Sequence, residues 1–159
     1  MTLLALAHVE GIPGPKGSLN GFCPTCARRG LPQRVVMKEQ SEVGVKFRKT
    51  VARQLRDSAF SNFSASYLGD VQTRLIFFIP RQMAVKNGVE QDYPVPSHDT
   101  ERPTHRNSGD VEKHVRTVHD ALMDVSAIKD DSQVWRTVAE KRWADAENPP
   151  GCVVEVKTA

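Results

Sequence analysis

The sequence contains few of the residues that stabilise small secreted proteins or anchor proteins in membranes. Only three of its 159 residues are cysteine, which is too few for a disulfide framework and suits a reducing compartment. The longest apolar run, residues 1–7, is too short to span a bilayer and lacks the charged segment of a signal peptide. We therefore expect a cytoplasmic protein that is not associated with a membrane.

Hydrophobic content and net charge are also modest. Hydrophobic residues make up 39% of the chain and the mean hydropathy is −0.44, which fits one domain with a real core and long polar loops. The formal net charge is only +3, a weak overall signal for nucleic acid. However, the acids gather in one segment, so the rest of the chain is more basic than this total suggests.

Residues 111–123 have the spacing of a helix. Apolar side chains recur at i, i+4, i+7 and i+11, which places them on one face. These side chains are Val111, Val115, Val118 and Leu122. A separate polar stripe at i, i+4 and i+8 consists of Glu112, Arg116 and Asp120. Asn107 or Ser108 can cap the start of this helix, because a short side-chain oxygen accepts a backbone N–H there.

Two pairs of acids flank this helix. Asp110 and Glu112 lie at its start, and Asp130 and Asp131 come just before a predicted strand at residues 134–143. If the pairs converge, their carboxylates raise each other's pKa, and a hard cation such as Mg²⁺ relieves the repulsion. Such a site suits phosphodiester hydrolysis. The alternative is that these are surface acids, which the helix dipole favours near an N-terminus.

The order and spacing of these residues resemble the RusA family of Holliday-junction resolvases. The matching residues are Asp110, Glu112, Arg116, Asp120-Ala121-Leu122, Asp130-Asp131-Ser132-Gln133-Val134 and Lys141. The turn at residues 13–18 is similar to the family's opening turn. Three positions depart from the family pattern, because Glu112, Lys113 and Arg116 stand where Asp, Asn and Lys are common. Arginine keeps the positive charge but hardly ever donates a proton, which favours an electrostatic role.

The resemblance implies a Mg²⁺-dependent endodeoxyribonuclease, with Mn²⁺ as an alternative ion, that resolves four-way DNA junctions in recombination and repair. It also implies a homodimer, which suits the approximate two-fold symmetry of a junction, in a bacterial or phage-infected cell. The implied metal ligands are Asp110, Glu112, Asp130 and Asp131, and the implied catalytic residues are Asp110, Glu112, Arg116 and Asp131. The implied DNA contacts are Lys16, Arg106, Lys113, Arg116, Lys141 and Arg142.

Two other functions stay open at this point. The three departures are compatible with a DNA-binding or regulatory protein that has kept the fold without turnover. A metal-dependent nuclease without junction preference is the third possibility. Cleavage of a junction in competition with a linear duplex separates all three.

A single C-x-x-C motif, formed by Cys23 and Cys26, lies in a predicted hairpin loop at residues 19–33, whose return strand is expected at residues 34–37. A structural zinc ion needs four ligands, and the motif supplies two. The others would have to come from His8 or from a second subunit. The simpler interpretation is a loop with free thiols.

The rest of the chain predicts a single α+β (mixed α/β) domain over residues 1–159, with helices packed against a mixed sheet. We expect strands at residues 2–12, 71–79, 134–143 and 152–156, with 71–79 central and buried on both faces. Residues 44–59 form a predicted helix with an apolar stripe of Phe47, Val51 and Leu55, and its basic face either is solvated or follows a DNA backbone. Residues 81–108 contain Pro94, Pro96 and Pro103, show no period and are expected to be one long loop that orders on DNA. His98 and His105 within it are candidate ligands or bases, although single loop histidines are more often neither.

Overall fold

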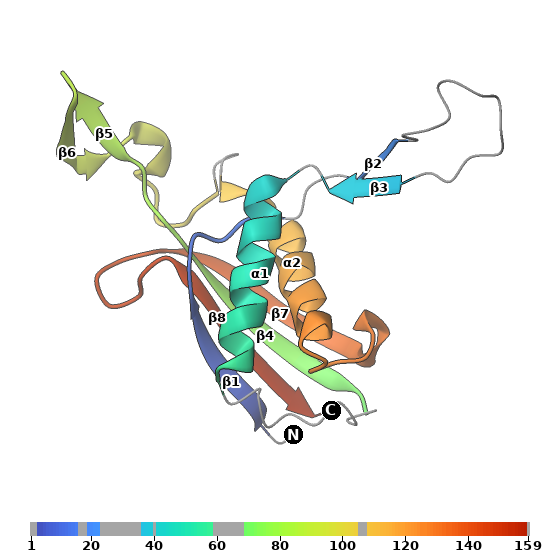
Figure 1. Cartoon of the computed structure of the whole chain (residues 1–159). Coiled ribbons are helices and arrows are strands. Elements are labelled where there is room, and N and C mark those ends of the chain that lie inside the picture. Colours follow the sequence, from blue (N-terminus) through green and yellow to red (C-terminus); the bar gives the residue numbers. More distant parts are fainter. Residues whose placement is uncertain are drawn as a thin grey trace, which may run out of the picture.

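A four-stranded mixed sheet is the framework of the computed structural model, which describes residues 3–15, 19–22, 36–39, 41–58, 69–104 and 108–158. Its strands, in spatial order, are β1 (Leu3–Glu10), β8 (Gly151–Thr158), β4 (Val71–Ile79) and β7 (Val134–Trp143). β8 is antiparallel to both of its neighbours, whereas β4 and β7 are parallel. Figure 1 shows both helices on one face of this sheet, so the predicted α+β class is confirmed.

β4 confirms the prediction of a central strand. It lies between β8 and β7, and Leu75 and Phe77 on its helix-facing side are fully buried. Phe78 points to the other face and is also buried, so the end of the strand is covered on both sides. The outer strands β1 and β7 alternate between buried and exposed residues or are largely exposed, as expected for sheet edges.

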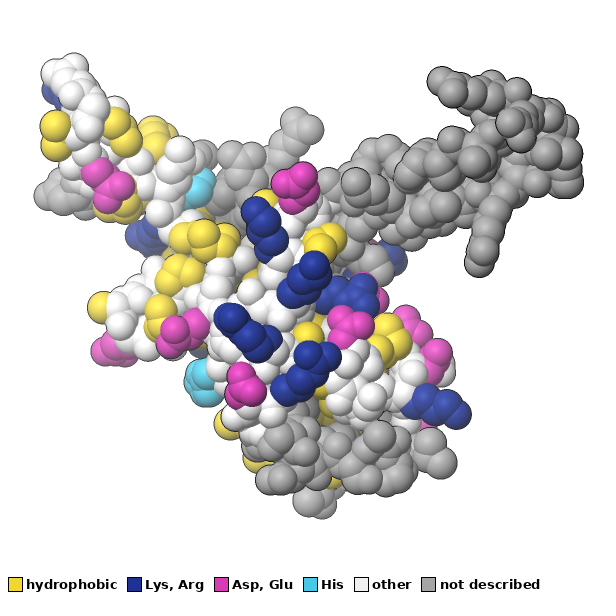
Figure 2. All heavy atoms as spheres, in the orientation of Figure 1, with side chains coloured by type: hydrophobic (Ala, Val, Ile, Leu, Met, Phe, Trp, Pro, Cys, Tyr) yellow, Lys and Arg dark blue, Asp and Glu magenta, His cyan; other side chains and the backbone are white. Residues whose placement is uncertain are grey.

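The two helices run side by side in the same direction (Figure 1). α1 (Glu42–Arg56) begins at Ser41, whose Oγ accepts the Gly44 backbone N–H at 3.0 Å, and it buries the predicted stripe of Phe47, Val51 and Leu55. Arg48 of α1 forms an ion pair with Asp124 of the second helix. Lys and Arg side chains follow the outer face of α1 in Figure 2.

The second helix, α2 (Val111–Asp124), buries Val118 and Leu122 of the predicted stripe, and Val115 packs against the core. Its buried residues are His114, Thr117, Val118, Ala121 and Leu122. Val111, which we placed on the apolar face, is 38% exposed. The prediction was wrong here because it treated valine as buried and histidine as polar, whereas tertiary packing buries His114 against Phe77.

A β-hairpin, which we call the arm, replaces part of the long loop that we predicted at residues 81–108. It consists of β5 (Met83–Lys86) and β6 (Val89–Pro94), and a 3₁₀ helix, η3 (Pro96–His98), follows it. Asn87 and Gly88 both have positive φ angles, 53° and 77°, as a two-residue type I′ turn requires. An Asn-Gly pair, here between Lys86 and Val89, is a strong hairpin signal in a sequence.

A second hairpin lies before α1, formed by β2 (Leu19–Phe22) and β3 (Val36–Glu39). The return strand was predicted at residues 34–37, two positions early. Cys23 and Cys26 lie outside the described residues. Neither helix in the described part of the chain has the length and apolar character needed to cross a membrane.

Candidate active site

The first acidic pair lies at the start of α2 and faces solvent. Asp110 is the N-cap residue, a position we had expected for Asn107 or Ser108, and its side chain makes no capping hydrogen bond. The Asp110 and Glu112 side chains are 74% and 72% exposed. Lys113 Nζ lies 3.5 Å from Asp110 Oδ2, and Arg116 forms an ion pair with Glu112. Two carboxylates and two cations are thus presented together on the first turns of one helix.

The backbone just before Asp110 is held from two sides. Lys141 Nζ, which reaches across from β7, donates to Ser108 Oγ and to the Gly109 carbonyl oxygen, each at 2.7 Å. His114 Nε2 lies 2.7 Å from the Ser108 carbonyl oxygen. A carbonyl can only accept, so Nε2 must carry the proton. These contacts fix the direction in which the chain enters α2, and therefore the place where Asp110 stands.

Gly109 makes this approach possible. Its φ is +71°, a conformation that residues with a side chain rarely adopt. A Cβ atom at this position would lie 2.8 Å from Pro15 Cγ and 2.9 Å from His114 Nε2. The chain therefore needs glycine immediately before the acid, both for the turn and for the space.

Burial changes the pKa of the two side chains that hold this backbone, His114 and Lys141. It lowers the pKa of His114, and the hydrogen bond to Ser108 opposes the shift only in part. Burial also lowers the pKa of Lys141, against the attraction of Asp110. We had interpreted Lys141 as a DNA contact, but its ammonium group is already engaged by Ser108 and Gly109. Its position supports a role in placing Asp110.

The second acidic pair lies at the other end of α2, where the 3₁₀ helix η5 (Asp131–Gln133) leads into β7. Asp130 caps η5, since its Oδ1 accepts the Ser132 backbone N–H at 2.9 Å, and the Gln133 side chain accepts the Asp130 N–H in return. Hydrogen bonds from the side chain and backbone of Ser132 keep the pKa of Asp130 below its usual value. Asp130 therefore serves as the cap of η5, and Asp131 lies beside it; both residues are exposed.

One chain does not bring the two pairs together. Asp110 caps the first turn of α2, whereas η5 with Asp131 lies beside the other end of this 14-residue helix (Figure 1). At 1.5 Å per residue, a helix of this length spans roughly 20 Å. Carboxylates that share a magnesium ion must each approach it to about 2.1 Å. Accordingly, no three histidine, cysteine or acidic residues among those described are arranged to hold a metal ion. The convergence that we expected does not occur within a protomer.

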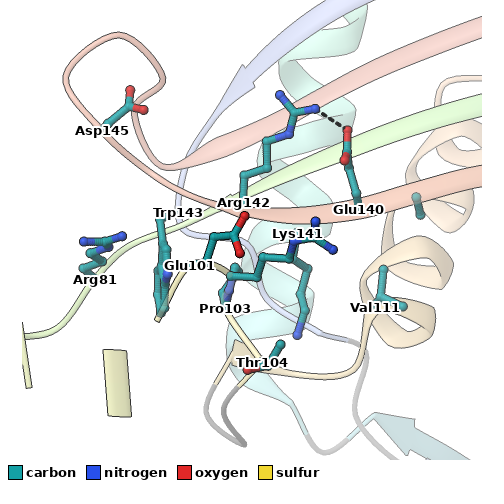
Figure 3. A pocket seen from close by; sticks show the side chains of 12 residues that line it. Arg81, Glu101, Pro103, Thr104, Val111, Glu140, Lys141, Arg142, Trp143 and Asp145 are labelled. Atoms are coloured by element: carbon teal, nitrogen blue, oxygen red, sulfur yellow. Dashed lines mark hydrogen bonds and ion pairs between the residues drawn. The ribbon is translucent and has the colours of Figure 1, made fainter. Parts of the chain in front are cut away.

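A pocket of about 670 Å³ lies next to the first acidic pair. It extends from Val111 at the start of α2 to Arg81 and Trp143 at the base of the arm (Figure 3). Trp143 is fixed there, because its Nε1 donates to the Thr100 carbonyl oxygen at 2.7 Å and its ring stacks on His98. Four cations line the pocket, against three acids. The cations are Arg81, Arg102, Lys141 and Arg142.

The positions of the remaining predicted site residues say less about function. Arg142 lines the pocket and forms an ion pair with Glu140 (Figure 3). Lys16 and Arg106 lie outside the described residues, as does His105. His98 is buried and accepts the Gln82 backbone N–H at 2.8 Å, so it supports the arm.

The sequence also matches a known protein family. The family model described as Endodeoxyribonuclease RusA matches residues 24–157, which include both acidic pairs, both helices and most of the sheet. The chain belongs to the RusA family of endodeoxyribonucleases. No individual curated protein matches the sequence.

The structure also identifies residues outside the RusA motif that position the first acid. Gly109, Ser108 and His114 lie on either side of the first acid and hold it in position. A glycine directly before the acid was the available signal for this turn. No spacing in the sequence indicated that Lys141 and His114 meet at one peptide, because that contact depends on how β7 and α2 pack.

Proposed function

We propose that the chain is a divalent-metal-dependent endodeoxyribonuclease that cuts four-way DNA junctions as a homodimer, in recombination or repair. The observation that carries this proposal is the exposed pair Asp110 and Glu112, presented on a fixed backbone in a member of the RusA family. Two carboxylates are enough to hold Mg²⁺, which keeps several waters and is completed by substrate phosphate. Mn²⁺ fits the same oxygen ligands.

The residues around this pair have complementary roles in the proposal. When bound, a divalent ion lowers the pKa of a coordinated water and offsets charge on the phosphate. Asp110 and Glu112 would hold the ion. Arg116 and Lys113, which pair with these carboxylates, would turn to the phosphate and stabilise its negative charge. Lys141 would keep Asp110 in place through Ser108 and Gly109.

The distance between the acidic pairs supports a site that is shared between two protomers. Asp110 and Asp131 lie at opposite ends of α2 in one chain, and the described residues contain no group of three acids, histidines or cysteines arranged for a metal ion. In a two-fold dimer, Asp131 of the partner subunit would complete the site, and the reciprocal pair would form a second, identical site. Two such sites match the two opposed strands that a junction resolvase must cut.

The direct test is a cleavage assay on an immobile four-way junction and a matched linear duplex, with Mg²⁺ or with EDTA. We expect paired nicks in the junction only, and only with the ion. Nicking of the duplex at the same rate would indicate a nuclease without junction preference.

A mixing experiment tests the shared site. Asp110→Asn and Asp131→Asn should each be inactive as homodimers. In a mixed dimer of the two variants, one site contains both substitutions and the other contains neither. We therefore expect nicking to return in the mixture, at one strand per junction. If each site were built within one protomer, the mixture would stay inactive.

A DNA-binding protein without turnover is the second candidate, favoured by Glu112, Lys113 and Arg116 at positions where the family commonly has other residues. Tight junction binding without nicks under any divalent ion would support it. The double reversion Glu112→Asp with Arg116→Lys would then be expected to restore nicking. Continued inactivity would mean that these two departures are not the cause.

A further inference from the structure

The outer face of α1 is a continuous row of cations. Between residues 46 and 56, every exposed position of the helix is lysine or arginine. These four residues, which we call the cation stripe, are Lys46, Lys49, Arg53 and Arg56. Their spacing of i, i+3, i+7 and i+10 aligns them along one side of the helix, and Figure 2 shows Lys and Arg side chains along it.

Exposed acids stand only at the two ends of the cation stripe, Glu42 four residues before Lys46 and Asp57 four residues after Arg53. Lys46, Lys49 and Arg53 have no acidic partner within the described part of the chain. By contrast, Arg48 turns inward to Asp120 and Asp124 of α2. Like charges at i, i+3 and i+4 destabilise a helix, so the stripe is unfavourable for folding alone.

Helix electrostatics explains only half of the stripe. Arg53 and Arg56 lie in the last turn, where the helix dipole favours positive charge. Lys46 and Lys49 lie in the first half of α1, where the dipole gives no such benefit. A solvated surface therefore accounts for the two arginines but not for the row as a whole.

The dimensions of the stripe match a DNA backbone. From Lys46 to Arg56 the helix rises roughly 15 Å, at 1.5 Å per residue. One strand of duplex DNA presents a phosphate about every 3.4 Å along its axis, so this length spans about four phosphates. α1 also packs directly beside α2, which presents Arg116 on the same layer of helices.

We propose that the cation stripe of α1 binds the phosphate backbone of one duplex arm of the DNA substrate. This inference rests on the proposed function, since it takes DNA as the substrate. It assigns the stripe to holding an arm, whereas the start of α2 acts on the scissile phosphate. The contact is with phosphate only, so it carries no base specificity.

The test measures the salt dependence of junction binding in EDTA, where no cutting occurs, by fluorescence anisotropy. Each phosphate contact contributes about 0.9 to the slope of log affinity against log salt concentration. We expect K49Q/R53Q to lower this slope by up to about 1.8, and the four-residue variant K46Q/K49Q/R53Q/R56Q to lower it further. Glutamine preserves helix propensity, and circular dichroism would confirm that each variant is folded.

The matched control is R74Q/R136Q, which removes two exposed cations from the sheet face that the helices do not cover. We expect a slope close to that of the wild type. Equal slopes for K49Q/R53Q and the wild type would overturn the inference, and so would equal losses in both double variants, because they would reflect net charge alone. If the wild type binds neither junction nor duplex, DNA itself is the wrong substrate and the proposed function fails with it.

Discussion

Helices α1 and α2 share one framework but differ in what they present to solvent. Both lie on the same face of the sheet, run in the same direction and are joined by the Arg48–Asp124 ion pair. Between residues 46 and 56 the exposed side chains of α1 are all cations, whereas α2 begins with Asp110 and Glu112 beside Lys113. Burial determines only the inner face of each helix. The outer faces are therefore free to diverge, and we assign binding to one and chemistry to the other.

The largest expected effect comes from Asp110→Asn. We predict that cleavage of a four-way junction falls on the order of a thousandfold, because a metal ion supplies several kcal/mol of charge stabilisation. Binding should persist or tighten, since a negative charge near phosphate is lost. K49Q/R53Q should show the opposite pattern, with weaker binding. Loss of binding in Asp110→Asn would instead indicate that Asp110 is needed for folding.

Asp130 and Asp131 provide the next comparison, at the far end of α2. Asp131→Asn should abolish cleavage without changing the Tm. Asp130→Ala should lower the Tm, because it removes the cap of η5 and leaves the Ser132 backbone N–H without its acceptor. Thermal unfolding and cleavage, measured on both variants, check this division. A lower Tm for Asp131→Asn with an unchanged Tm for Asp130→Ala would reverse the assignment.

A substitution at Gly109 tests whether the position of Asp110 matters. Gly109→Ala should cost at least about 1–2 kcal/mol in unfolding free energy, the cost of the left-handed conformation, and should reduce cleavage as well. Gly88→Ala in the arm is the matched control. Gly88 also has a positive φ, but a Cβ there meets nothing within 4 Å. It should lose stability without loss of cleavage. Full activity in Gly109→Ala would show that Asp110 tolerates a shift.

The smallest effect concerns the pH dependence of stability. α2 contains two histidines, His114 and His119, whereas α1 contains none. Burial lowers the pKa of both His114 and His119 in the folded state. The unfolded chain therefore binds more protons just below the ordinary value of 6.5, and unfolding free energy should fall as the pH drops through that value. Replacing His119 with glutamine should lower the number of protons taken up on unfolding by up to about one. Denaturant unfolding between pH 7 and pH 5 measures this number from the slope of unfolding free energy against pH. An unchanged dependence would mean that His119 does not contribute.

Local patterns predicted most of the framework. The strands at 71–79 and 134–143 were predicted with their observed bounds, because both combine β-branched and apolar residues. The stripe of Phe47, Val51 and Leu55 predicted α1. The arm was not predicted, because the prolines in this segment favour an irregular loop. Asn87-Gly88, which forms its turn, was the signal for a hairpin.

The residue types and their order establish which chemistry is available: two pairs of acids at a spacing typical of the RusA family, with cations between them. Where these groups stand depends on how the helices and strands pack. A helix is a rigid rod of roughly 1.5 Å per residue, so the length of α2 keeps the acids at its two ends apart, although both belong to one motif. Packing of β7 against α2 likewise placed Lys141 on the backbone of Gly109, thirty-two residues away. Spacing along the chain does not contain these distances, because they depend on which elements pack together.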